Sequence, residues 1–448
     1  MCPVSRVFLR VPAFARKDSS ILKITKIEVI SLRYEYPAGQ GFQFSGGYCN
    51  GRLSCLVFVH TDAGLTGVGS VYSHPSLVTS IIEDHLQPVL LHEDPLQVEL
   101  LWDRCYRLTR WYGRKGVAIS ALGGIDIALW DIRGKAVGKP IFELLGGKRP
   151  YVPAYASALL WKDDPAELGR EAARHVAEGF HGVKMRLGRS HEYDRLAVRT
   201  VRETIGPHNR LLIEGNARYN LSQAERIAVD YRAAGVFWLE EPFPPEDIDS
   251  YLALRPNVGL PLAAGENEFG VQGFRELLDR RIVDIVQPDC SRTGGITACR
   301  RIGELAAHYG LRVATHSWSD AVAIVANMHV IASLENGITV EIDRTGNSLI
   351  DELLVTPLRV LDGEVAVPHG PGLGIELNPA ALERFRMPKG APLPDGNYSD
   401  MVFGRDYFTP AGPYDPKETT VPCVAEYSAA DSRAAVSTDL DPSRDGPH

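Results

Sequence analysis

The chain has 448 residues, 44% of them hydrophobic, and a formal net charge of −8. This length and composition can bury a large core, and we expect two domains. The acidic balance and the lack of a long basic run argue against nucleic-acid binding. No apolar stretch approaches the ~20 residues of a membrane span. The seven cysteines are scattered and form no CxxC pair, which favours a reducing cytoplasm over a disulfide-rich or zinc-binding protein.

The first 148 residues contain an extension followed by an α+β domain. The charged residues of 1–22 are mostly basic, and we expect the segment to be disordered; a targeting segment or an incorrectly assigned start are the alternatives. From residue 23 to about 148, strand-like segments and helical periodicity predict an α+β domain. Within it, the loop 38–51 is rich in Gly and aromatic residues. Such a loop can close over an apolar ligand, although a plain hairpin connection is the alternative.

From residue 149 to 354, short apolar segments alternate with amphipathic helices at regular spacing. Eight such segments in this order predict a β/α barrel more strongly than an open sheet. Functional residues in these barrels lie at the C-terminal ends of the strands. The predicted strands are 152–158, 182–187, 211–215, 237–241, 261–266, 283–289, 311–316 and 338–343.

The remaining segments are less regular. Residues 355–386 are strand-like and rich in turns, and we expect them to pack back on the first domain. Residues 387–448 are predicted to be a largely disordered tail. Beyond about Pro410 the tail has too few large apolar groups to offset the entropic cost of ordering, so we expect it to be dispensable for stability.

Three glutamates stand at equal spacing along the chain, and each follows a short apolar run. They are Glu214 in LLIEGN, Glu240 in FWLEEP and Glu266 in PLAAGEN. The chain between them is about the length of one βα unit, so their side chains could converge at one end of adjacent parallel strands. Clustered carboxylates suit Mg²⁺, with Mn²⁺ as the alternative. Each glutamate alone could be an ordinary surface acid, but the matched spacing favours a metal site.

Several motifs occur in the same order as in a known family. From about Lys23 to Met387 the chain resembles the enolase superfamily, mandelate racemase subgroup. The resemblance rests on ALGGIDIALWDIRGKAVGKPIFELLGG at 121–147, Lys184-Met185-Arg186, Glu214-x-Asn216, Glu240-Glu241-Pro242, Gly265-Glu266-Asn267, Asp289 in QPD, His316 in ATHSW and Glu341 in VEID.

The resemblance implies a modified, TIM-like (β/α)8 barrel of (β/α)7β type, covered by an α+β capping domain at 23–148. It also implies that Mg²⁺ held by the three glutamates stabilises the enediolate formed when the proton α to a carboxylate is removed. Lys184 is expected to be a cation near the substrate carboxylate, and Glu341 a protonated acid that hydrogen-bonds it. Asn216, Arg186 and Lys184 are the expected substrate-binding residues. A homo-oligomer is the family expectation.

Two positions depart from the family pattern. The first metal ligand is usually Asp and is Glu214 here, which moves the carboxylate by about 1.5 Å, the length of one C–C bond. The usual second lysine of the KxK motif, a base on one face of the substrate, is Arg186. A guanidinium group does not deprotonate in proteins, so we expect Arg186 to hold the substrate as a clamp.

His316, paired with Asp289, is then the remaining base. A single base can remove the α-proton and then protonate a leaving β-hydroxyl on the same side, which is dehydration. We therefore predict a hydro-lyase that converts a sugar acid (an aldonate or aldarate) to a 2-keto-3-deoxy acid. Cycloisomerisation of a sugar-acid lactone and racemisation or epimerisation of a 2-hydroxy acid are the alternatives. A catalytically silent binding protein is disfavoured, because it would have little need for the complete set of acids.

Overall fold

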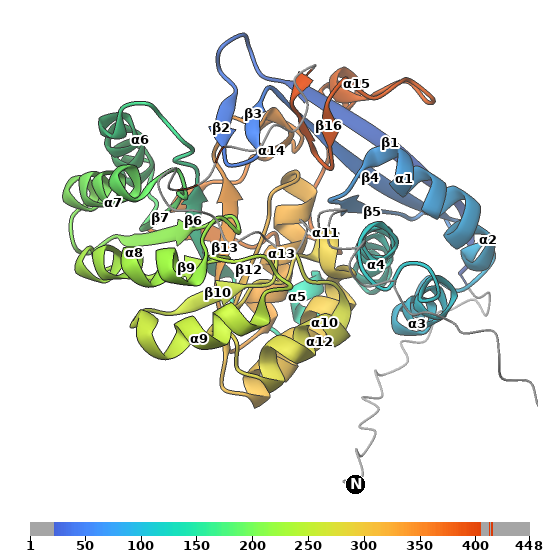
Figure 1. Cartoon of the computed structure of the whole chain (residues 1–448). Helices are drawn as coiled ribbons and strands as arrows, with labels where there is room; N and C mark the ends of the chain where they lie inside the picture. Colours follow the sequence, from blue (N-terminus) through green and yellow to red (C-terminus); the bar gives the residue numbers. More distant parts are fainter. Residues whose placement is uncertain (1–21, 405–411, 413, 415–448) are drawn as a thin grey trace, which may run out of the picture. The chain divides into compact units, whose positions relative to one another are not determined.

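The computed structural model describes residues 22–404, Gly412 and Tyr414 (Figure 1). The predicted extension 1–22, apart from Leu22, and nearly all of the tail beyond Pro410 therefore lie outside the described residues. Residues 22–404 belong to one compact unit. Among the described residues, no helix is both long and apolar enough to cross a membrane.

Eight parallel strands close into a barrel, because the last strand pairs with the first. Each lies within one residue of a segment that the sequence predicts or inside it, so the predicted fold class is confirmed. The strands are β6 (Tyr151–Ser157), β7 (Gly182–Arg186), β8 (Arg210–Glu214), β9 (Trp238–Glu240), β10 (Leu262–Ala264), β11 (Ile285–Val286), β12 (Arg312–Thr315) and β13 (Gly337–Asp343).

Long helices follow the first seven strands, and only the single turn α14 (Ser348–Asp351) follows the eighth, as in a (β/α)7β barrel. Several begin where the sequence supplies a cap. Asn220 and Gln223 form a capping box at α8, and Asp320 accepts two backbone hydrogen bonds at α13. The barrel helices are α6 (Pro165–Ala177), α7 (His191–Ile205), α8 (Leu221–Ala233), α9 (Ile248–Val258), α10 (Gly270–Asp279), α11 (Cys290–Thr293), α12 (Gly295–His308) and α13 (Ala321–Ser333).

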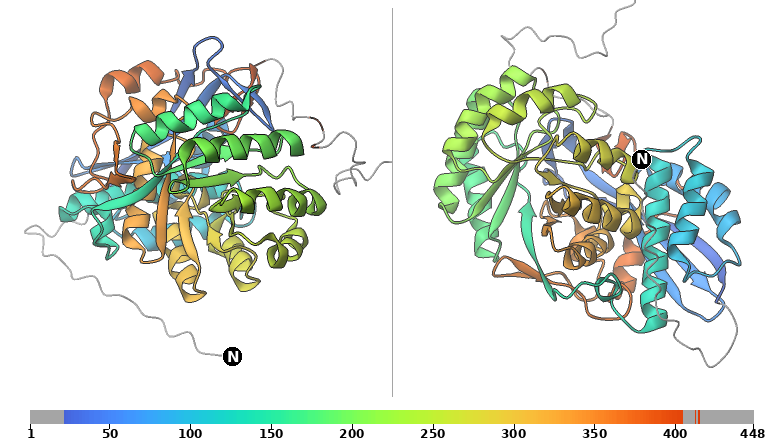
Figure 2. Two further views of the ribbon diagram at one scale, coloured as in Figure 1. Left: turned by 90° about the vertical axis from the view of Figure 1, so that its left-hand side faces the viewer. Right: turned by 90° about the horizontal axis from the view of Figure 1, so that it is seen from below.

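The capping domain lies to one side of the barrel helices (Figure 2, right). Its antiparallel sheet contains β1 (Ile24–Glu35), β4 (Gly51–Thr61) and β5 (Thr66–Val71), and its helical segments are α1 (Pro75–Ser80), the π-helical turn η1 (Ile81–Leu86), α2 (Gln87–Leu90), α3 (Val98–Thr109), α4 (Val117–Val137) and α5 (Ile141–Leu144). The loop 38–51 carries a small hairpin of β2 (Phe42–Phe44) and β3 (Gly47–Cys49).

Helix α4 joins the two domains. It packs on β5 and also on α11 and α12 of the barrel. It is therefore apolar nearly all round and buried over most of its length, as expected of a helix with partners on several sides. Gly67 and Gly69 let β5 approach the α4 backbone, because a Cβ at either position would collide with it.

The segment 355–386 returns to both domains, and not only to the first domain as predicted. Strand β14 (Val360–Leu361) and strand β15 (Glu364–Ala366) form a hairpin, and β15 pairs with the N-terminal half of the barrel strand β6. The pairing buries Val365 against Val152, which explains the preference for the barrel. Helix α15 (Pro379–Phe385) packs on β1 of the capping sheet, and Arg386 forms a bridge with Leu32 on the same strand.

The beginning of the predicted disordered tail is a structured part of the capping sheet. Strands β16 (Asn397–Tyr398) and β17 (Met401–Val402) form a tight hairpin, and β17 pairs with β4. The prediction of disorder from residue 387 is therefore wrong for residues 397–402. We call residues 396–404 the strap. Its Asp400 is fully buried and forms an ion pair of 2.7 Å with Arg52 on β4, which supplies the stabilisation that the local sequence lacks.

Candidate active site

The barrel interior is filled below the site by a layer of apolar side chains that includes Leu212 and Trp238. Side chains two residues apart on a strand point the same way, so Glu214 and Glu240 project from the next layer up. Glu266 follows β10 by two residues. One carboxylate oxygen from each of the three glutamates lies within 4.8 Å of the others. The structure thus brings together the three glutamates that are equally spaced in the sequence.

These carboxylates could hold a divalent cation. Glu214 and Glu240 are buried, and the Glu266 side chain is 16% exposed. The buried Oε2 of Glu266 accepts no hydrogen bond from any described residue. An all-oxygen set of acidic donors with such an oxygen fits a hard ion such as Mg²⁺ and does not suit zinc.

Lys184 lies beneath these acids and is completely buried. Its Nζ lies 2.6 Å from Glu240, 2.9 Å from Glu341 and 3.3 Å from Glu214. Burial lowers the pKa of Lys184, but the three carboxylates outweigh it and hold the pKa well above its usual value. Lys184 does not line the pocket described below, so in this structure it holds the acids together rather than facing the substrate space.

Glu341 lies close to three basic side chains. Burial raises the pKa of Glu341, but Lys184, His316 and Arg186 hold it at about 2. Their nearest nitrogen atoms lie 2.9, 3.9 and 3.9 Å away. In this structure these groups favour the ionised form of Glu341, and the protonated form that the resemblance implies stays a prediction for the substrate-bound site. Its Oε2 also accepts a hydrogen bond from the backbone N–H of Ser317 at 3.0 Å.

Arg186 is held in a fixed orientation at the side of the pocket. Its Nε lies 3.1 Å from Glu214, and its guanidinium carbon lies 3.9 Å from the centre of the Trp318 ring. One terminal nitrogen donates a hydrogen bond to Ser157 at 3.2 Å. Burial lowers the pKa of Arg186, but Glu214, Glu341 and other acids raise it overall. Arg186 therefore remains a cation and cannot accept a proton.

His316 and Asp289 form a buried pair. The Nδ1 of His316 lies 2.8 Å from Asp289, which also accepts hydrogen bonds from Ser291 and Asn327. With Nδ1 donating to Asp289, Nε2 faces the pocket, 3.4 Å from Glu266. Burial lowers the pKa of His316, but Glu266, Glu341 and Asp289 raise it to about 10. The pKa of His316 therefore depends on how many of these three acids carry a negative charge.

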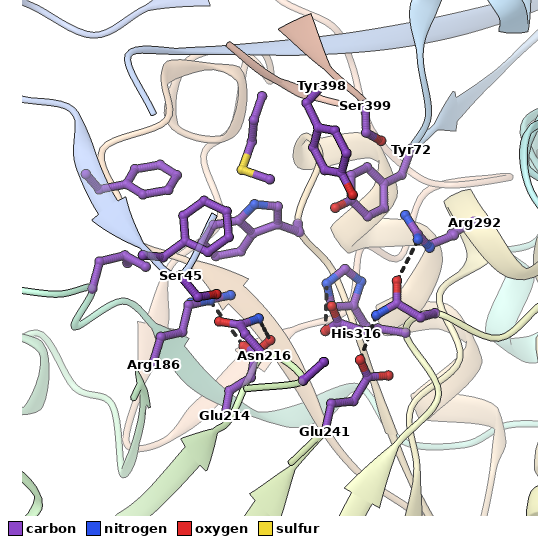
Figure 3. A pocket seen from close by; sticks show the side chains of 18 of the residues that line it. Ser45, Tyr72, Arg186, Glu214, Asn216, Glu241, Arg292, His316, Tyr398 and Ser399 are labelled. Atoms are coloured by element: carbon purple, nitrogen blue, oxygen red, sulfur yellow. Dashed lines mark hydrogen bonds and ion pairs between the residues drawn. The ribbon is translucent and has the colours of Figure 1, made fainter. Parts of the chain in front are cut away.

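A pocket of about 360 Å³ opens above these groups (Figure 3). Its walls come from the barrel mouth, from two capping segments and from the strap. The capping segments are the loop 38–51, which the sequence predicts can close over a ligand, and residues 72–74. The contribution of the strap to the pocket was not predicted from the sequence. The lining residues are Phe42, Phe44, Ser45, Tyr72, Ser73, His74, Leu160, Arg186, Glu214, Asn216, Ala217, Glu241, Glu266, Asn267, Arg292, His316, Trp318, Tyr398, Ser399 and Met401.

Three lining residues that the sequence did not single out as site residues form a chain of hydrogen bonds. Asn267 donates to Glu241 at 2.6 Å and accepts from Arg292 at 2.7 Å. Burial, with a contribution from Glu266, raises the pKa of Glu241 to about 8. Glu241 also has a positive φ of 33°, as does Asn216 at 46°. Such backbone strain concentrates at functional sites. For Glu241 and Asn267, the signal available in the sequence was a polar residue just after a predicted strand end, in EEP and GEN.

Comparisons with known proteins place the chain in a family. The model described as "Mandelate racemase / muconate lactonizing enzyme, N-terminal domain" matches residues 27–146, and the model described as "Enolase C-terminal domain-like" matches residues 167–381. A D-galactarolactone cycloisomerase from Agrobacterium fabrum is 36% identical over 82% of this chain and 100% of the relative. An arabinonate dehydratase from Saccharolobus solfataricus is 33% identical over 73% of this chain and 89% of the relative.

A solved structure agrees with these matches. It is the structure of a racemase from Streptomyces coelicolor A3(2) with bound magnesium, which superposes with a TM-score of 0.76 at 26% identity and covers 81% of this chain and 100% of the other. The two matched models together span most of the described residues, with residues 147–166 between them where the capping domain joins the barrel. The chain therefore belongs to the enolase superfamily, in its mandelate racemase subgroup.

Proposed function

We propose that this protein is a Mg²⁺-dependent dehydratase of sugar acids that converts an aldonate or aldarate to a 2-keto-3-deoxy acid. The observation that carries the proposal is the His316–Asp289 pair beside a cluster of three glutamates, with an arginine at the position of a second base. The site thus offers one base and several fixed cations. Arabinonate and D-xylonate dehydratases among the relatives support the substrate class.

Glu214, Glu240 and Glu266 are the residues that would hold the metal. When bound, Mg²⁺ would stabilise the second negative charge that develops on the substrate carboxylate as the α-proton leaves. The magnesium in the Streptomyces coelicolor structure supports the choice of ion. Lys184 keeps the carboxylates close together despite their mutual repulsion, because its charge lies within ion-pairing distance of two of the three.

The protein's own groups then move the proton. His316 accepts the α-proton at Nε2, and Asp289 stabilises the imidazolium that forms. The electron pair of the broken C–H bond forms the C–C double bond as the β-C–O bond breaks. His316 returns its proton to the departing hydroxyl, which leaves as water, and the enol becomes the 2-keto acid. Arg186 and Asn216 orient the substrate from the side opposite Arg292 (Figure 3).

His316 must be neutral to accept a proton, although its pKa is about 10 with the surrounding acids unneutralised. Glu266 and Glu341 are the largest sources of the increase. Neutralising the charge of Glu266 removes one of them and shifts the His316 pKa back toward the range of a general base. The proposed base and the proposed metal site are therefore electrostatically linked.

A lactone cycloisomerase is the second candidate. The Agrobacterium fabrum relative, matched over its whole length, has that activity by name. The same base would remove the α-proton, but a ring oxygen would leave in place of water. Racemisation needs a second base on the opposite face, and Arg186 cannot serve as one. The two candidates therefore differ only in the leaving group.

The test is to incubate the protein and Mg²⁺ with a panel of aldonates, aldarates and aldaric lactones. Dehydration is recognised by a 2-keto product one water lighter than the substrate, whereas cycloisomerisation of a lactone leaves the mass unchanged. Both should stop when the metal is chelated and resume when Mg²⁺ is restored. Turnover that survives chelation would contradict the proposal, as would inversion of a 2-hydroxy acid without elimination. We also retain as predictions a cytoplasmic location and a homo-oligomer.

A further inference from the structure

The pocket contains a second arginine that the proposed chemistry does not use. Arg292 lies on α11, in the turn after β11, and lines the pocket. In Figure 3 it lies on the opposite side of His316 from Arg186. The pocket is therefore cationic at two separated places, one beside the three glutamates and one beyond the histidine.

The contacts of Arg292 leave its charge without a close acid. One terminal nitrogen donates to the amide oxygen of Asn267 at 2.7 Å, and the guanidinium lies over the Tyr72 ring, 4.8 Å from its centre. Its Nε is buried and has no hydrogen-bond partner among the described residues. No carboxylate of a described residue lies within 4.0 Å of it. Arg186, by contrast, has Glu214 at 3.1 Å.

Asp400 of the strap is the acid that could have served as the partner of Arg292. Burial raises the pKa of Asp400, Arg52 opposes that shift strongly, and Arg292 opposes it weakly. The charge of Arg292 therefore reaches Asp400, but the carboxylate itself lies 2.7 Å from Arg52. Asp400 is paired with Arg52, so the guanidinium of Arg292 can bind a ligand in the pocket.

Asn267 fixes the orientation of this arginine. Its amide donates to Glu241 at 2.6 Å while its oxygen accepts from Arg292, so the amide cannot turn without losing both bonds. A half-buried guanidinium with a fixed orientation at the pocket wall is suited to a carboxylate, which it can bind through two parallel hydrogen bonds. A neutral hydroxyl would leave the charge of Arg292 without an anionic partner.

We propose that Arg292 binds a second carboxylate at the far end of the substrate, so that the substrate is an aldarate and not an aldonate. The inference rests on the proposed function, which places the first substrate carboxylate at the metal ion that the three glutamates would hold. It assigns Arg292 as the residue that determines specificity for the terminal group, with Asn267 as its positioning residue.

The test compares a hexarate with the hexonate of the same configuration, which differs only at the far carbon. For the wild-type protein with Mg²⁺, kcat/KM is expected to be higher for the hexarate. In Arg292→Gln, kcat/KM for the hexarate should fall roughly ten- to a hundredfold more than for the hexonate, the range that a charge-assisted hydrogen bond supports. Arg292→Lys restores the charge without the paired donors and should recover part of the loss.

Arg275→Gln is the matched control, because Arg275 is an exposed arginine on α10 that pairs with Asp279 outside the pocket. Its kinetics should equal the wild type with both substrates, and circular dichroism should show that all variants are folded. A wild-type preference for hexonates, or an equal loss with both substrates in Arg292→Gln, would overturn the inference while the dehydratase proposal stands. If the wild type acts on neither substrate class, the proposed function fails and the inference fails with it.

Discussion

The Nε atom of Arg186 lies 3.1 Å from the Oε2 atom of Glu214. These two residues are the positions at which the chain departs from its family pattern, an arginine for a lysine and a glutamate for an aspartate. The longer glutamate side chain brings its carboxylate to the guanidinium, which in turn stacks on Trp318. The two departures therefore form one contact, and we expect them to be energetically coupled.

A double-mutant cycle should reveal this coupling. Arg186→Lys removes the fixed Nε donor, and Glu214→Asp withdraws the carboxylate, so each single change should weaken Mg²⁺ binding and turnover. The double variant should lose less than the sum of the two, with a coupling free energy of about 0.5–3 kcal/mol. Calorimetric titration with Mg²⁺ measures it. Strictly additive losses would show that the two positions act separately.

Replacing Glu240 with Gln should abolish tight Mg²⁺ binding while the barrel stays folded. The change removes one negative charge from the cluster and keeps the shape of the side chain. Turnover should fall in proportion to metal occupancy. Glu276→Gln, an exposed change on α10, is the control and should bind Mg²⁺ as the wild type does. Wild-type Mg²⁺ affinity in Glu240→Gln would remove Glu240 from the site.

Mg²⁺ affinity should depend on pH near neutrality. Burial, followed by the repulsion of Glu214 and Glu341, raises the pKa of Glu240 to about 7 despite Lys184. Protons then compete with the metal below that pH, so affinity should fall by up to about tenfold per pH unit below 7. Above pH 7 it should still rise, because metal binding also lowers the pKa of His316. Titrations in buffers of different ionisation enthalpy would detect the released proton. An affinity that rises as the pH decreases would contradict this assignment.

The strap should depend on the buried cluster of Arg52, Asp343 and Asp400. Arg52 lies 2.8 Å from Asp343 and 2.7 Å from Asp400, and it also donates to the backbone oxygen of Trp318. Arg52→Met leaves two buried carboxylates without a cation and should cost about 3–5 kcal/mol of unfolding free energy. Asp400→Asn leaves Arg52 paired with Asp343 and should cost about 1–3 kcal/mol. Urea unfolding distinguishes them, and a larger cost for Asp400→Asn would refute the ranking.

The barrel was predictable because its signal is local. Each strand is a short apolar run that ends at a polar residue, as in LLIEGN or FWLEEP, and the regular spacing of such runs permits few other folds. The strand ends then identify Glu214, Glu240 and His316 as neighbours without any knowledge of side-chain contacts.

The strap and the role of Arg292 were not predictable from local sequence. Strands β16 and β17 have two residues each, and β17 is held by pairing with β4 and by Asp400 against Arg52, which are remote in the chain. The surroundings of Glu341 could not be predicted for a similar reason. Its pKa depends on three basic side chains that come close to it only in the folded protein.

We propose that His316 is the only general base of this site. The most direct measurement is exchange of the substrate α-proton in D₂O, followed by NMR, for the wild type and for His316→Asn, which keeps the size of the side chain and removes the titratable nitrogen. The wild type should incorporate deuterium and eliminate water, and His316→Asn should do neither while still binding Mg²⁺. Arg186→Lys, which supplies a second titratable group, should retain exchange. Exchange at the wild-type rate in His316→Asn would place the base elsewhere and contradict the single-base mechanism.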